Sequence, residues 1–213
     1  MMFRRRISPA RDGSGGCRLH LSQGERALLA SLPNDLAGVL TTLDDSGAGS
    51  GAEAGLPPSL KRLFPPAYTR DDEAEHSYQA LARADLLEHH RESLVTMAET
   101  AGATSLTAEQ VNEWLRALND LRLVIGTILE VTEDGESLAA SLANADEATK
   151  HQVAVYQYLS GLQSEVIEFL ETLLPDPIPG ADDQVPSDPW GEPIGGVRWD
   201  GTPFPTAPDE DQW

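Results

Sequence analysis

The sequence is poor in the residues that cross-link a chain or carry it through a membrane. Cys17 is the only cysteine among 213 residues, so an internal disulfide is impossible and a disulfide-rich secreted protein is excluded. No apolar run approaches the roughly 18–20 residues that span a bilayer. The arginines near the amino terminus are not followed by the apolar segment of a secretory signal. We therefore expect a soluble, cytoplasmic protein without membrane contacts.

Basic residues are also scarce, because 15 Lys and Arg face 35 Asp and Glu, for a formal charge of -20. Residues 1–20 nevertheless carry a net charge of +4, against -16 for residues 21–174 and -8 for residues 175–213. The overall negative field repels nucleic acid within about 8–10 Å in physiological salt. Nucleic acid is therefore a disfavoured partner, and contact with it would require the amino-terminal arginines. Alternatively, this basic segment lies on an acidic patch of its own domain.

Apolar residues recur at spacings of three and four, which predicts a mainly α-helical bundle. The helical segments are expected at residues 22–43, 60–68, 71–102, 107–131 and 145–174. Ser22 with Glu25, and Thr107 with Gln110, are capping boxes that mark two helix starts. Pro33 should divide or kink the first segment, because proline lacks an N–H donor and clashes with the preceding turn. The segments 107–131 and 145–174 should pack as an antiparallel pair.

The segments outside this bundle have three different compositions. Residues 2–7 and 17–21 can pair as a small amino-terminal β-hairpin across the glycine-rich turn of residues 11–16. Residues 44–58 resemble a flexible linker by composition. We expect one domain over residues 1–174, followed by an acidic tail at 175–213.

The tail holds nine of the fifteen prolines and nine acidic residues, so it should be disordered by default. Trp190, Trp199 and Trp213 lie among these acids and prolines. Such a pattern is typical of short motifs that fold on a partner. The alternative is that one or two of these tryptophans pack on the bundle.

No group of residues has the pattern of an active site, so we expect no catalytic, cofactor or metal site. The basic neighbourhood of Cys17 favours a lowered thiol pKa and a redox role, but Cys17 and His20 face opposite sides of a strand. His89 and His90 point about 100° apart on a helix and cannot share one metal ion. The sequence therefore favours a protein that is not an enzyme.

Two stretches carry a family resemblance. Residues 63–68 (LFPPAY) with 71–75 (DDEAE), and residues 114–127 (WLRALNDLRLVIGT), are similar to motifs of an actinobacterial uncharacterised-domain family. The genes of that family commonly lie beside the ClpS adaptor gene, and one branch is described as an oxidative-stress-sensing transcriptional regulator (AosR). The resemblance covers about residues 2–174 and implies a cytosolic, mostly helical, non-enzymatic regulator. With one thiol, this member has either lost disulfide-based sensing or senses through an intermolecular bond or a sulfenic acid.

Taken together, these patterns predict a regulatory protein of the stress response that acts through protein–protein contacts. Its partner would be transcription machinery or a proteolytic adaptor of the ClpS/Clp system, and a homodimer is compatible with the sequence. Direct DNA binding through the basic amino terminus is the alternative. The candidate interaction residues, besides the tail tryptophans, are Arg4, Arg5, Arg6, Arg116, Asn119, Asp120 and Arg122. Asn119 and Asp120 have a second possible role, capping a buried turn or pairing with the motif around Tyr68.

Overall fold

The computed structural model describes residues 5–10, 15–45, 56–68, 70–131, 142 and 145–174. The chain divides into one unit at Met1–Leu174 and another at Pro175–Trp213. The tail with its tryptophans, Arg4, and most of the segment between the last two helices lie outside the described residues. The predictions made for them stay predictions.

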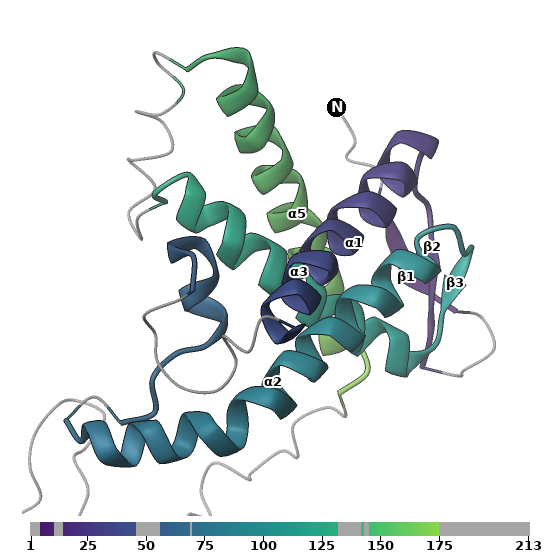
Figure 1. Cartoon of the computed structure of the whole chain (residues 1–213). Coiled ribbons are helices and arrows are strands. Elements are labelled where there is room, and N and C mark those ends of the chain that lie inside the picture. The colour runs from purple at the N-terminus through teal and green to yellow at the C-terminus, as the bar shows by residue number, and fades with distance from the viewer. Residues whose placement is uncertain are drawn as a thin grey trace, which may run out of the picture. The chain divides into compact units, whose positions relative to one another are not determined.

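Four long helices form the first unit, in agreement with the mainly α prediction (Figure 1). They are α1 (Gln23–Asp45), α2 (Asp72–Thr100), α3 (Ala108–Ile128) and α5 (Glu147–Glu171), with a short 3-10 helix, η2 (Pro58–Leu63), before α2. Both predicted capping boxes are present. Ser22 and Glu25 exchange hydrogen bonds at the start of α1, and Thr107 and Gln110 do so at α3. No helix in the described part of the chain is long and apolar enough to span a bilayer.

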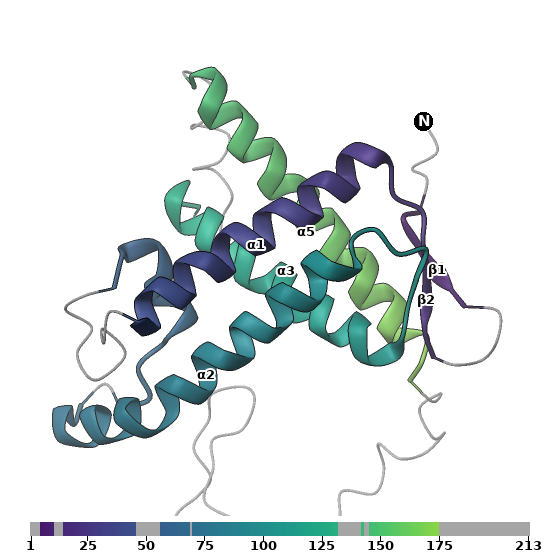
Figure 2. The same ribbon diagram turned by 45° about the vertical axis from the view of Figure 1, so that its right-hand side comes forward.

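Helix α3 is the centre of the packing, because it contacts α1, α2, α5 and η2. Its inward face buries Val111, Trp114, Leu118 and Leu121 almost completely, and the indole N–H of Trp114 donates to Thr100 Oγ1 at 2.8 Å. Residues 122 and 126 of α3 meet residues 160 and 156 of α5, so these helices run antiparallel as predicted. Figure 2 shows α1 beside α2, with the strands at one end.

The small sheet has three antiparallel strands in the order β1 (Ile7–Pro9), β2 (Cys17–Leu19) and β3 (Ser105–Leu106). The amino-terminal hairpin is present, but its first strand begins at Ile7 instead of residue 2, and Ile7 pairs with Leu19. Gly15 has a φ of +70°, which side chains disfavour and which the turn requires. The pairing of β3 with β2 was not predicted, because a two-residue strand leaves no periodic signal.

The structure decides two local expectations. Helix α1 continues through Pro33, which is fully buried, so the first segment does not divide into two helices. The predicted linker is shorter than expected at both ends, because α1 extends to Asp45 and Leu56 is buried; residues 46–55 lie outside the described part.

Candidate functional site

The two family-like stretches meet at a buried ion pair. His90 of α2 donates from Nδ1 to Asp120 Oδ2 of α3 at 2.6 Å, and from Nε2 to the carbonyl of Leu63 at 3.1 Å. Both ring nitrogens face acceptors, so both carry protons and the imidazole is charged. The Asp120 side chain is only 4% exposed. This group, which we call the histidine clamp (His90, Asp120 and the Leu63 carbonyl), ties η2 to two helices.

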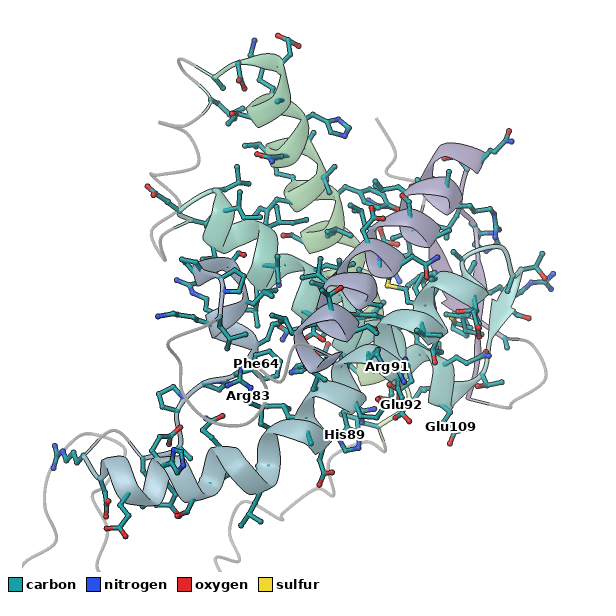
Figure 3. The ribbon with its side chains drawn as sticks, viewed as in Figure 1. Phe64, Arg83, His89, Arg91, Glu92 and Glu109 are labelled. Atoms are coloured by element: carbon teal, nitrogen blue, oxygen red, sulfur yellow. The ribbon has the colours of Figure 1, made fainter. Side chains whose placement is uncertain are left out.

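Aromatic contacts enclose the histidine clamp. The Phe64 ring meets the His90 ring edge-on, with centroids 5.6 Å apart. The Arg83 guanidinium lies over the ring of Phe64, 5.4 Å from its centroid. Figure 3 shows these two side chains next to each other. The neighbouring His89 is exposed instead, as expected for adjacent positions on a helix. Phe64 thus shields the ion pair from water on the η2 side.

Electrostatics favour the charged form of the clamp histidine. Burial alone would lower the pKa of His90, since it penalises the imidazolium. The hydrogen bond and charge of Asp120, with the bond to the Leu63 carbonyl, outweigh burial and raise that pKa above its ordinary value. The clamp therefore holds best when the imidazole is protonated.

The rest of the first stretch is held by the start of α2. Glu75 Oε2 accepts the backbone N–H groups of Ala67 and Tyr68 at 2.9 and 2.7 Å, and Asp71 caps the helix by accepting from the Ala74 N–H. Asp71 and Glu75 therefore have a local structural role. They fix the turn that follows η2.

On a different face of α3 lies a groove of about 200 Å³. We call it the basic groove, and its lining is Arg62, Asn119, Arg122, Leu123, Gly126, Val131 and Tyr156. It forms where η2, α3 and α5 meet. Among the residues that the structure describes, its lining holds two arginines and no carboxylate, in a chain with more than twice as many acidic as basic residues.

Arg122 is fixed in this groove by neutral partners. Its Nε donates to Ser160 Oγ at 2.9 Å, its Nη1 donates to Gln163 Oε1, and its guanidinium lies 5.6 Å from the centroid of the Tyr156 ring. Gly126 permits this packing, because a Cβ there would lie 3.2 Å from Tyr156 Cε2. The arginine is thus held in place by partners that carry no negative charge.

The amino-terminal arginines are in the opposite situation. The backbone N–H of Arg6 donates to Glu165 Oε2 at 2.6 Å, and its Nε lies 3.2 Å from Glu165 Oε1 and 3.9 Å from Glu25 Oε1. Arg5 lies 3.6 Å from Glu168. The sequence left two alternatives for this basic segment, contact with nucleic acid or contact with an acidic patch of its own domain. In the structure, Arg5 and Arg6 contact the acidic patch.

Cys17 does not have the environment expected of a reactive thiol. It is fully buried in β2, and burial raises the pKa of its thiol to about 11. The expected lowering by basic neighbours is therefore wrong. A thiol that is buried and protonated at neutral pH reacts slowly with oxidants.

The structure separates the four residues of α3 that were predicted to form one polar surface. Asn119 and Arg122 line the basic groove, whereas Arg116 is exposed and paired with Glu113. Asp120 is buried, which contradicts a place on an exposed surface. The second role predicted for Asp120, pairing with the motif around Tyr68, is closer to the structure. Asp120 reaches the 63–68 stretch through His90, which bonds the Leu63 carbonyl. Arg62, His90 and Tyr156 were missed, although the Lys61-Arg62 pair in an acidic chain was a usable signal.

Comparisons with known proteins agree with the resemblance. The model of the family described as a domain of unknown function, DUF2017, matches residues 4–170. A Mycobacterium leprae (strain TN) protein that bears the name AosR is 31% identical over 171 residues, which cover 67% of this chain and 77% of that protein. Proteins of Mycobacterium bovis and Mycobacterium tuberculosis (strain H37Rv), named oxidative stress regulator AosR, are 29% identical over 178 residues, covering 70% of this chain and 80% of each. No solved structure matches significantly. The chain therefore belongs to the DUF2017 family.

Proposed function

We propose that this protein is a non-enzymatic regulator in the oxidative stress response, acting in the cytoplasm by binding a partner protein. The observation that carries the proposal is the basic groove, where two arginines and an asparagine converge beside apolar residues and an aromatic ring. These groups bind and orient a ligand. The seven described residues that line it include no carboxylate, histidine or cysteine that would act as a general base or a thiolate nucleophile.

The relatives support the regulatory part of the proposal. Proteins named oxidative stress regulator align with 70% of this chain. Cys17 is a poor candidate for the sensor itself, because its thiol is buried and protonated. In this chain, regulation would follow from binding a partner. Transcription machinery and a proteolytic adaptor are the two partner classes that the resemblance implies.

Gene deletion in the native host tests the regulatory role. Transcripts are measured before and after a peroxide pulse in the wild type, in the deletion strain, and in strains complemented with the full chain or Arg62→Glu. We expect the deletion to change the peroxide response, the full chain to restore it, and the groove variant not to restore it. Arg5→Glu is the matched control, since it reverses an exposed arginine away from the groove and should restore the response. An unchanged transcript response in the deletion strain would rule out the proposal.

A further inference from the structure

The basic groove is an exception to the charge of the molecule. Its seven lining residues include Arg62 and Arg122, and none of the seven is acidic. The described residues that line the groove thus contribute two positive charges and no negative charge. This local charge favours an anion over a cation.

The arginines of the groove are prepared for such a ligand. Arg122 uses two of its five N–H groups on Ser160 and Gln163, which leaves three donors without a partner among the described residues. Both partners are neutral, so neither offsets the positive charge of the guanidinium. Because its position is already fixed, a carboxylate can bind without much further loss of side-chain entropy. Guanidinium groups bind carboxylates in a two-pronged geometry.

The dimensions of the groove favour a peptide over a duplex. A volume of about 200 Å³ accommodates one or two side chains, not a nucleic-acid backbone. A duplex would extend beyond the groove onto a protein surface that carries most of the -20 charge. Leu123, Val131 and the ring of Tyr156 add an apolar wall beside the arginines. This wall suits an apolar side chain next to an acidic one.

We propose that the basic groove binds an acidic segment of a partner protein, with Arg62 and Arg122 receiving a carboxylate and Leu123 and Val131 contacting an adjacent apolar side chain. This inference rests on the proposed function and names the surface and the partner chemistry. The histidine clamp has a supporting role, because it holds the carbonyl of Leu63, the residue next to Arg62. It thereby fixes η2 at the edge of the groove.

Fluorescence anisotropy with the full chain tests this proposal. The probe is a labelled 12-residue peptide of alternating glutamate and leucine, and its matched control has glutamine in place of glutamate. We expect the acidic peptide to bind at least tenfold more tightly, with an affinity that falls as salt is raised. Arg62→Gln should weaken binding at least fivefold, and Arg122→Lys, which keeps the charge but loses the planar fork, should also weaken it.

Arg5→Gln is the control for net charge, and its affinity should equal that of the unaltered chain. Equal binding of the two peptides, or equal affinity of Arg62→Gln and Arg5→Gln, would overturn the proposal. Displacement of the peptide from the groove by a 20-base-pair duplex, with the same dependence on Arg62, would also overturn it, in favour of nucleic acid.

The peptide measurement and the gene deletion test different proposals, so a negative result in one can be told from a negative result in the other. Peptide binding without any change in the peroxide response would remove the regulatory role and keep the groove as a binding site. A changed peroxide response that Arg62→Glu restores fully would keep the regulatory role and remove the groove from it.

Discussion

Arg5 and Arg6 face carboxylates of their own domain, whereas Arg62 and Arg122 line a groove whose described residues include no carboxylate. The first pair lies in the most basic segment of the sequence, and the second pair comes from two separate elements, η2 and α3. A local run of positive charge thus does not identify the charge that a partner can reach. What decides is the set of tertiary neighbours, which are glutamates for Arg6 and neutral side chains for Arg122.

The largest effect on the free energy of unfolding is expected from breaking the histidine clamp, which holds η2 at the edge of the basic groove. Asp120→Ala removes one partner of a buried ion pair and leaves the His90 imidazolium facing an apolar methyl group. We expect a loss of about 3–5 kcal/mol in the free energy of unfolding, measured by urea titration with circular dichroism. Asp120→Asn keeps an acceptor oxygen and should lose less. A loss below about 1 kcal/mol for the alanine variant would show that the clamp does not hold η2.

Breaking the ion pairs of Arg6 with Glu165 and Glu25 should have a smaller effect on the free energy of unfolding. Arg6→Met keeps the apolar stem but leaves Glu165 and Glu25, both about one-quarter exposed or less, without their cation. These ion pairs are more buried than surface pairs and less buried than the histidine clamp, so a loss of about 1–3 kcal/mol is expected in the same titration. Binding of the acidic peptide should be unchanged. A stable variant with weakened peptide binding would reverse the comparison between the two arginine groups.

The third prediction concerns pH and separates the two regions by chemistry. The pKa of His90 is raised in the folded protein, so its contribution to stability is complete below the ordinary histidine value of about 6.5 and is lost as pH rises through the folded value. A decline of up to about 1.4 kcal/mol per pH unit follows from one proton. His90→Gln should flatten the profile of unfolding free energy above about pH 6.5. Arg6→Met leaves the bond between His90 and Asp120 in place, so it should keep the slope.

Much of the fold was predictable because it is encoded locally. Ser22 with Glu25 and Thr107 with Gln110 are complete within four residues, and each begins a helix where it was expected. Ser105–Leu106 was not predictable, because its pairing with β2 joins residues almost ninety positions apart. Pro33 was tolerated because its ring is buried in the packing of α1, a tertiary gain that outweighs the local cost.

The candidate site was predictable only in part, for the same reason. Asn119, Asp120 and Arg122 are close in sequence, but a helix rotates about 100° per residue. Asp120 therefore faces α2 while the other two face the groove. Arg62 and Tyr156 complete the groove from other elements, and no pattern within a short window brings them to α3. His90 was considered only as a metal ligand, whereas its partners lie 27 and 30 residues away.

The smallest effect tests whether all amino-terminal arginines are equivalent. Arg5 and Glu168 form an ion pair in which the two side chains are 77% and 59% exposed. Solvent screens such a pair and the side chains lose entropy by holding it, so Arg5→Gln should change the free energy of unfolding by no more than about 0.5 kcal/mol. Adding 0.5 M salt should reduce even that difference. If Arg5→Gln instead matched Arg6→Met in urea, the amino-terminal contacts would act as one cooperative network. The depth of burial at Arg6 would then no longer explain why it stabilises the domain.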